Sequence, residues 1–174
     1  MGAPTNFSRT FLSFLLLLCL LGSSSLGQND PVKNFCRRWG RQSAVVDGKL
    51  YIDGGLINYQ DATNNLTDTF LTFNDIDAVN SDGMPPFYAN LLKNDTIPSV
   101  NGGILWEDSI NKRLSLYGGE YQSTRPPSTS NLYSYDVLYN EWVSFGPITQ
   151  EVQAASYGAG VSIPSRGEAY YYGG

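Results

Sequence analysis

Few residues of this chain have the types and spacing that enzyme chemistry requires. The 174 residues include no histidine, although histidine is the commonest general base and the commonest protein ligand of transition metals. Catalytic triads and mononuclear zinc sites therefore lack an essential member. We expect no catalytic, cofactor-binding or metal-binding residue in this sequence, and we lean towards a protein that is not an enzyme.

Acidic side chains cluster between Asn74 and Gly83, in a pattern that invites comparison with a Ca²⁺ site. The segment does not fit the frame of an EF-hand loop, because Val79 stands where an oxygen ligand belongs and no glutamate closes the loop. We interpret these carboxylates as solvated turn residues. Glu107-Asp108 has the same interpretation, since acidic residues favour the backbone geometry of turns.

Aromatic residues form a second candidate site. The series comprises Tyr133, Tyr135, Tyr139, Trp142 and Phe145. Aromatic faces of this kind bind sugars in extracellular lectins, but Tyr133 and Tyr135 share one face of a strand with a period of two. Because each ring buries a large apolar area, we favour packing over ligand contact.

The elements that position these residues come in a phrase that occurs three times. Each phrase is a hairpin followed by a diglycine: residues 43–53 before Gly54-Gly55, 103–117 before Gly118-Gly119, and 158–172 before Gly173-Gly174. Asp47-Gly48 is the clearest turn, because a two-residue hairpin requires positive φ at both positions. The last glycines stand at 55, 119 and 174, so the period is 64 and then 55 residues. Repetition on this scale predicts a repeat architecture.

The residues after the second diglycine extend the pattern. Tyr135 and Trp142 stand where a tyrosine and a tryptophan follow the diglycine of a kelch repeat, and residues 41–174 therefore resemble the kelch family. The resemblance implies an all-β fold, a kelch-type β-propeller whose four-stranded blades surround a central channel. It assigns structural roles in the kelch motif to Gly54, Gly55, Gly118, Gly119, Tyr135, Trp142, Gly173 and Gly174.

The resemblance also implies an incomplete propeller. A closed propeller has about 4 to 8 blades, whereas residues 41–174 supply about two and a half. Gly173-Gly174 falls in the middle of a blade, so we expect a fragment of a longer protein. A partial propeller is expected to leave an unpaired strand edge and an exposed face between blades.

Two features of the first repeat depart from the family pattern. Asp53 precedes the first diglycine, whereas Tyr117 and Tyr172 precede the other two. This carboxylate either caps the diglycine turn or lines the channel mouth and contacts a ligand. Residues 75–98 form a long, turn-rich insertion, which we interpret as a binding loop, with a disordered insertion as the alternative. This repeat lacks the tryptophan, and Phe87, along with Tyr88, is the nearby aromatic substitute.

The N-terminus has the three parts of a secretory signal peptide. Arg9 precedes an apolar run from Phe11 to Leu21, and small residues follow as far as Gly27, after which we expect cleavage. The run is shorter than the roughly 20 apolar residues that a membrane-spanning helix needs. We therefore predict a signal peptide over 1–27, a lead-in segment over 28–40 and a partial propeller over 41–174, truncated in the middle of a blade.

Export predicts features that can be checked in the sequence. Asn65 and Asn94 head N-glycosylation sequons in predicted loops. Cys36 is the only cysteine left after signal cleavage, and an unpaired cysteine in a secreted protein points to a partner elsewhere. We expect a secreted or cell-surface protein; attachment to a membrane requires a transmembrane helix downstream of the propeller.

The net charge of the chain argues against one class of partner. A net charge of −5 argues against nucleic acid, because phosphate binding needs a basic surface. The basic cluster of Arg37, Arg38 and Arg41 is interpreted as a solvated segment ahead of the first predicted strand.

Two functions stay open. The first is a non-catalytic kelch-repeat interaction module of an exported protein, which offers the loops 56–67, 75–98 and 120–130 to a protein or a glycan. The second is the N-terminal part of a galactose-oxidase-like copper carbohydrate oxidase. That resemblance implies a copper ion held by tyrosine and histidine side chains, and no residue of this chain matches those histidines.

Overall fold

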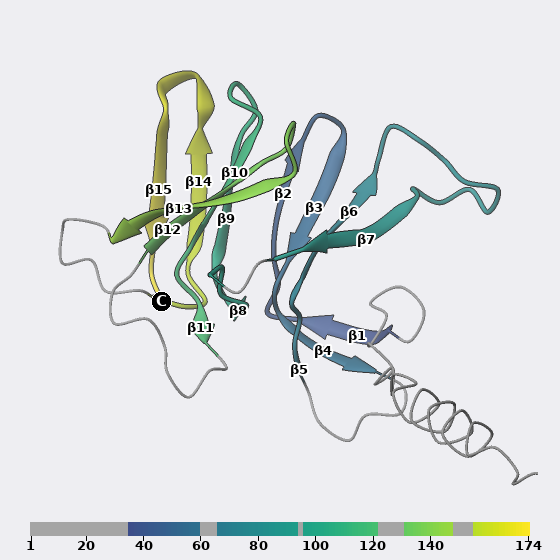
Figure 1. The fold of residues 1–174 in the computed structure, drawn as a ribbon, viewed down its shortest axis with the longest axis horizontal. Coiled ribbons are helices and arrows are strands. Elements are labelled where there is room, and N and C mark those ends of the chain that lie inside the picture. The colour runs from purple at the N-terminus through teal and green to yellow at the C-terminus, as the bar shows by residue number, and fades with distance from the viewer. Residues whose placement is uncertain (1–34, 60–65, 94–95, 122–130, 148–154) are drawn as a thin grey trace, which may run out of the picture.

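The computed structural model describes residues 35–59, 66–93, 96–121, 131–147 and 155–174, and these residues form an all-β fold (Figure 1). The predicted signal peptide and the two sequons at Asn65 and Asn94 lie outside the described residues. Within the ranges that the structure describes, no helix is long and apolar enough to cross a membrane. The expectation of an all-β fold is confirmed.

Two four-stranded antiparallel sheets and one hairpin carry the three repeats. Sheet 1 has the order β2 (Gln42–Val46), β3 (Lys49–Asp53), β6 (Phe70–Asp75) and β7 (Phe87–Leu92). Sheet 2 has the order β9 (Ile104–Asp108), β10 (Arg113–Tyr117), β12 (Asn131–Asp136) and β13 (Glu141–Pro147). Hairpin 3 consists of β14 (Ala159–Ile163) and β15 (Glu168–Tyr172), joined through the short 3-10 helix η1 (Pro164–Arg166). These sheets are consistent with the blades of a kelch propeller.

Two smaller sheets lie at one end of this assembly, below the main sheets in Figure 1. One has the order β1 (Phe35–Trp39), β4 (Leu56–Tyr59) and β5 (Leu66–Thr67), and the other pairs β8 (Val100–Asn101) with β11 (Glu120–Tyr121). β1 lies in the segment expected to be a lead-in and pairs antiparallel with β4.

The order of the strands gives the assembly two distinct ends. Because successive strands are antiparallel neighbours, the first and third turns of each sheet lie together, and we call this the turn end. It comprises the segments 47–48, 76–86, 109–112, 137–140 and 164–167. The diglycines follow the second strand of each repeat at the opposite end, which we call the diglycine end (Figure 1).

The diglycines make the same contact in the first two repeats. The N–H of Gly55 donates to the carbonyl of Val100 at 2.9 Å, and the N–H of Gly119 donates to the carbonyl of Ala155 at 3.0 Å. Gly54 and Gly118 have φ of 55° and 69°. A Cβ on Gly54 would collide with the Val100 carbonyl oxygen, and one on Gly118 would lie 2.5 Å from that of Ala155. The absence of a side chain thus lets each diglycine reach the start of the next repeat.

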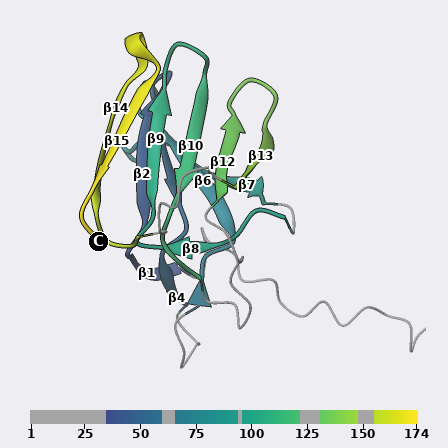
Figure 2. The same cartoon turned by 90° about the vertical axis from the view of Figure 1, so that its left-hand side faces the viewer.

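A second set of backbone bonds links the inner strands. The N–H of Gly102 donates to the carbonyl of Gly40 at 2.6 Å, and the N–H of Tyr157 donates to the carbonyl of Gly102 at 2.7 Å. All three residues have positive φ, although Tyr157 carries a side chain; its hydroxyl donates to Asn101 Oδ1 at 2.5 Å. In the perpendicular view, β14 and β9 lie side by side, next to β2 (Figure 2).

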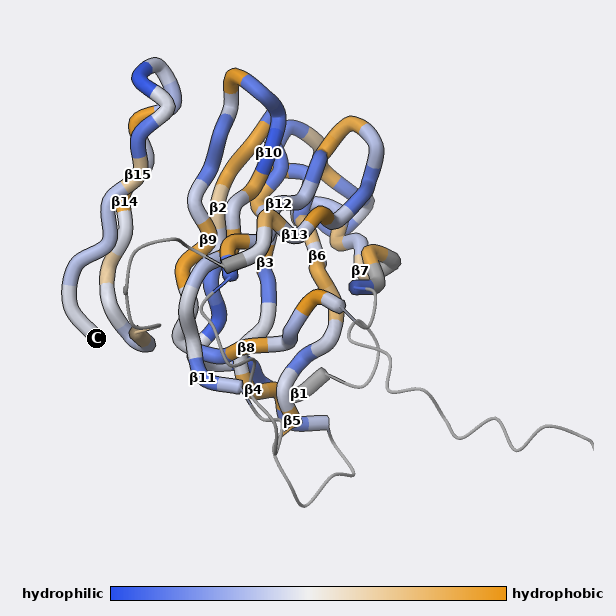
Figure 3. The backbone as a smooth tube through the Cα atoms, turned by 60° about the vertical axis from the view of Figure 1, so that its left-hand side comes forward, coloured by the Kyte–Doolittle hydropathy of each residue, from blue (hydrophilic) through white to orange (hydrophobic). Residues whose placement is uncertain are grey.

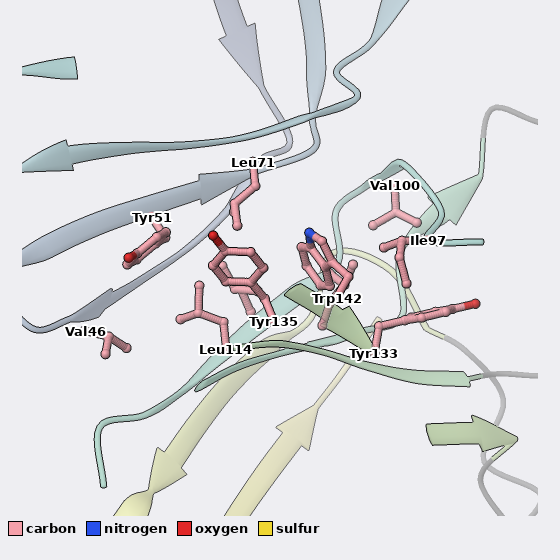
Figure 4. Packing of buried hydrophobic residues seen from close by; sticks show 11 residues of the cluster. Val46, Tyr51, Leu71, Ile97, Val100, Leu114, Tyr133, Tyr135 and Trp142 are labelled. Carbon is pink, nitrogen blue, oxygen red and sulfur yellow. The ribbon is translucent and has the colours of Figure 1, made fainter. Parts of the chain in front are cut away.

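The hydrophobic core lies between sheet 1 and sheet 2. Tyr51 of β3 faces Tyr135 of β12 with ring centres 6.1 Å apart, and Tyr135 in turn packs on Trp142 at 5.3 Å (Figure 4). Leu71 and Leu114 complete the contact from the two sheets. Burial, followed by the nearby carboxylate of Asp47, raises the pKa of Tyr51 to about 12. Burial also raises the pKa of Tyr135, whose hydroxyl donates to Asn140 Oδ1 at 2.9 Å.

The expectation of a loop-like insertion over residues 75–98 is wrong, because part of this segment is a strand. Residues 76–86 form a loop between β6 and β7, residues 87–92 are β7, the fourth strand of sheet 1, and the described residues after 92 lead to β8. Phe87 pairs with Asn74 in the way that Trp142 pairs with Tyr135. The strand was not predicted because Pro85-Pro86 is typical of a strand break. In the structure the two prolines precede the strand, so their lack of an N–H group costs the sheet no hydrogen bond.

Candidate functional site

Asp53, the residue singled out for ligand contact, lies in a buried ion pair. Its side chain is 0% exposed, and its carboxylate accepts hydrogen bonds from Gln42 Nε2 at 2.7 Å and from Lys93 Nζ at 2.9 Å. The Lys93 ammonium also lies 2.6 Å from the second carboxylate oxygen. We call Gln42, Asp53 and Lys93 the buried ion-pair site.

Lys93 connects this site to sheet 2. Its Nζ donates to the carbonyl of Pro98 at 3.1 Å and lies 5.3 Å from the centre of the Trp142 ring. An ammonium over the face of a tryptophan is attracted by the ring quadrupole. The side chain that neutralises Asp53 therefore also helps to join the first two repeats at the diglycine end.

The equivalent positions carry no charged residue in the other two repeats. Gln42 pairs with Asp53 across β2 and β3, as Ile104 pairs with Tyr117 and Ala159 with Tyr172. The first repeat thus has a carboxylate, with an amide and an ammonium as its partners, where the other two repeats have a tyrosine opposite an aliphatic residue. Both oxygens of Asp53 are engaged inside the protein, and its contact with a ligand stays a prediction.

A second buried ion pair lies on the other side of sheet 1. Arg38 Nη2 pairs with Asp68, and Arg38 Nη1 donates to Thr72 Oγ1 at 3.2 Å. The two charged side chains are 7% and 1% exposed. Burial lowers the pKa of Arg38 to about 10, while the carboxylate of Asp53 opposes the shift, so the guanidinium stays charged at neutral pH. The interpretation of Arg38 as a solvated residue is wrong, because β1 folds back on β4 and covers it.

Polar side chains at the end of β6 and in the loop after it accept hydrogen bonds from the local backbone. Asn80 Oδ1 accepts hydrogen bonds from the N–H groups of Asp82 and Met84 at 2.9 and 3.0 Å, and Asp75 Oδ1 accepts one from Asp77 N at 3.2 Å. These are contacts of the kind that Asx turns make. In the described ranges, no group of three or more Cys, Asp and Glu side chains is placed to hold a metal ion.

The turn end carries exposed apolar residues of the first two repeats. Its exposed members are Ile76, Val79, Met84, Ile110, Leu138 and Tyr139. Figure 3 shows hydrophobic colour at the tips of the β9–β10 and β12–β13 turns. Val79 and Tyr139 are 73% and 78% exposed. We call these six residues the turn-end surface.

Polar contacts hold the turns in fixed relative positions. The N–H of Ile76 donates to the carbonyl of Gly48 at 2.8 Å within sheet 1, and Val137 N donates to the carbonyl of Lys112 at 2.9 Å within sheet 2. Lys112 Nζ lies 2.5 Å from Asp47 Oδ1 and ties the two sheets together. Burial raises the pKa of Asp108, but hydrogen bonds from Asn111 outweigh it and lower the pKa below its usual value. The turn end is therefore preorganised.

The loops predicted to bind a partner do not gather at one end. The segment 76–86 belongs to the turn end, whereas the described parts of 56–67 and 120–130 form β4, β5 and β11 at the diglycine end. The reason is topological: connections from the second to the third strand lie opposite those from the third to the fourth. The turns 109–112 and 137–140 were not predicted to form a binding surface. The one signal in the sequence was Tyr139, an aromatic residue that falls outside the alternation of the strands.

Comparison with known proteins gives the class of this fold. No protein-family model matches the chain. A Kelch repeat-containing protein of Arthroderma benhamiae is 30% identical over 192 aligned residues, which cover 94% of this chain. Together with the repeated diglycine contacts, this similarity defines a kelch-type repeat protein of antiparallel sheets.

The chain belongs to the kelch-repeat family. It spans 28% of the length of the curated relative it matches.

Proposed function

We propose that this chain is the N-terminal part of an exported kelch propeller, a non-catalytic module that binds a protein partner through its turn end. The exposed apolar turn-end surface carries this proposal. Kelch-repeat proteins in general mediate protein interactions. An exposed apolar patch rimmed by polar groups is typical of an interaction site, and preorganised turns lose little conformational entropy on binding.

The charge of the loop 76–86 indicates the chemistry of the partner. Exposed Asp77 and Asp82 flank the apolar residues of the 76–86 loop, and they favour a partner that brings basic groups.

Export and fragmentation are parts of the same proposal. The charged, apolar and small-residue regions of 1–27 support a signal peptide. The two sheets and hairpin 3 would be the first blades of a propeller closed by a longer polypeptide, as the 28% coverage of the relative supports. The copper-oxidase alternative is not favoured, because the relative is described by its repeat and this chain has no histidine to match the copper ligands.

The proposal is tested with paired surface variants of the secreted chain. Ile110→Asp with Leu138→Asp places two charges on the turn-end surface, and Leu66→Asp with Thr69→Asp places two exposed charges at the diglycine end. Proteins cross-linked to the chain at the surface of the secreting cells are then identified by mass spectrometry. We expect the turn-end variant to lose its cross-linked protein and the control to keep it; equal capture by both variants would contradict the proposal.

Export and glycosylation have their own readout. We expect the secreted chain to begin at Gln28 and to lose mass on treatment with an endoglycosidase. Retention in the cytosol, or a mass that the enzyme leaves unchanged, would remove that part of the proposal without affecting the turn-end surface.

A further inference from the structure

The diglycine end carries a concentration of positive charge, although the chain as a whole has a net charge of −5. Arg37 and Arg38 lie in β1, and Arg41 follows that strand by two residues. Arg38 is buried and paired with Asp68, whereas Arg37 and Arg41 are exposed. Within the described ranges, neither exposed arginine pairs with a carboxylate. Two guanidinium groups therefore stand without a counter-charge at this end.

The strand holds these groups in fixed places. Because successive side chains of a strand alternate between faces, Arg37 and Trp39 lie on the face opposite the buried Arg38. The guanidinium of Arg37 lies 5.3 Å from the centre of the Trp39 ring, a contact that orients it. The carbonyl of Gly40 accepts a hydrogen bond at 2.6 Å from the backbone of the second repeat. Burial is the largest cause of the lowered pKa of Arg38, and repulsion by Arg41 adds to it, so these positive charges lie close together.

The second repeat shows that the fold does not require these charges. β8 pairs with the strand after its diglycine, as β1 pairs with β4. Trp39 and Asn101 both pair with the first residue after a diglycine, so they are equivalent. In this register the exposed arginines have uncharged counterparts: Ser99 for Arg37 and Gly103 for Arg41. The charge is a feature of the first repeat alone among these two.

β1 also has an open edge. It pairs with β4 on one side and has no second neighbour among the described strands. An open strand edge presents N–H and C=O groups to an incoming strand. Arginines beside such an edge repel a strand that carries cations and attract one that carries carboxylates. The edge therefore selects for acidic sequences.

We propose that the edge of β1 is a docking surface for an extended acidic segment of a partner protein, which pairs with the backbone of β1 and brings carboxylates to Arg37 and Arg41. A guanidinium binds a carboxylate through two parallel hydrogen bonds, and backbone pairing adds affinity. β1 lies at the diglycine end, so this inference does not depend on partner binding at the turn end (Figure 1).

The proposal is tested by fluorescence anisotropy on the secreted chain. The probe is a labelled peptide in which glutamate alternates with valine over about ten residues, a length that spans a strand. Three ligands are compared with it: the same peptide with lysine in place of glutamate, a version whose backbone N–H groups are all methylated, and dextran sulfate. Hydrogen exchange of the β1 amides is measured with and without the probe.

We expect saturable binding of the glutamate peptide, no binding of the lysine peptide, and binding at least about tenfold weaker after methylation. Arg37→Gln with Arg41→Gln should weaken binding of the glutamate peptide by about tenfold or more. Arg113→Gln with Arg166→Gln removes two exposed arginines from the turn end and is the matched control, which should bind like the unchanged chain. The β1 amides should exchange about tenfold more slowly with the probe bound.

Three outcomes would overturn the inference. They are equal weakening by the two double variants, equal binding of the methylated and unmethylated peptides, and no binding of the glutamate peptide. Dextran sulfate that binds only when Arg37 and Arg41 are present, without protection of the β1 amides by the peptide, would identify a polyanion site in place of a strand-docking edge. The variant Ile110→Asp with Leu138→Asp should bind the probe unchanged, which separates failure of this inference from failure of the turn-end proposal.

Discussion

The interface between sheets 1 and 2 and the interface between sheet 2 and hairpin 3 are built on the same backbone contacts but differ in how they are filled. In both, the diglycine of one repeat bonds to the start of the next, through Val100 in the first case and Ala155 in the second. The first interface holds a packed aromatic core, whereas the second holds a pocket of about 420 Å³. The diglycine contacts thus set the spacing of the repeats, and the third and fourth strands supply the packing.

The two interfaces also differ in polarity at one equivalent position. Asp53 is neutralised by Lys93 in the first repeat, and Tyr117 occupies the same place in the second. A buried carboxylate is stable only with a partner, whereas an aromatic ring is stabilised by burial alone. The first interface therefore depends on one cation from the segment that leads to the second repeat.

The comparison predicts the largest loss of stability for a ring in the filled interface. Tyr135→Ala should lower the free energy of unfolding by about 4 kcal/mol, since it leaves a cavity among rigid neighbours. Tyr171→Ala, at the wall of the open pocket, should cost only about 1 kcal/mol. Urea denaturation followed by circular dichroism measures both, and equal losses would show that the two interfaces are equally packed.

The ion pair should give the next largest effect. Lys93→Met leaves the Asp53 carboxylate buried without its cation and should cost about 3 kcal/mol. The double variant Asp53→Tyr with Lys93→Met introduces the aromatic solution of the second repeat and should recover most of that loss. The same denaturation experiment checks this pair; a double variant no more stable than Lys93→Met would mean that the charge is not the source of the cost.

The diglycine contact, shared by both interfaces, should give a smaller effect of equal size in each. Gly54→Ala and Gly118→Ala combine a left-handed φ with a close carbonyl oxygen and should each cost about 2 kcal/mol. Gly83→Ala, also at positive φ but with open space around it, isolates the backbone strain and should cost about 1 kcal/mol. Melting temperatures of the three variants separate the backbone strain from the contact with the next repeat. Identical shifts for all three would mean that this contact contributes nothing to stability.

The smallest effect is confined to alkaline pH. Because burial raises the folded-state pKa of Tyr51 to about 12, its protonated form contributes stability that is complete below the unfolded pKa of about 10 and is lost as pH rises through the folded value. Absorbance at 295 nm and circular dichroism should show ionisation of Tyr51 coupled to unfolding in this window. Tyr51→Phe should move the alkaline unfolding midpoint to higher pH. An unchanged midpoint would show that ionisation of Tyr51 does not destabilise the first interface.

The locally encoded parts of the fold could be predicted from the sequence. The turn at Asp47-Gly48 has φ of 49° and 65°, as a two-residue hairpin requires, and the three expected hairpins are β2–β3, β9–β10 and β14–β15. The strands β1, β4, β5, β7 and β11 were not predicted. For β7, two prolines and the lack of a tryptophan concealed the pattern. Its pairing depends on β6, which a single-sequence pattern does not report.

By itself, then, the sequence determined the repeat, the hairpins and the positions of the diglycines, because each depends on residues close together in the chain. Only the tertiary structure decided the partner of Asp53, which lies 40 residues away at Lys93, and the burial of Arg38 against Thr72, 34 residues away. It also decided that the turns lie at one end of the sheets and that Ser115 and Ala169 line one pocket. Each of these follows from which strands pair and which faces meet, and no residue encodes that alone.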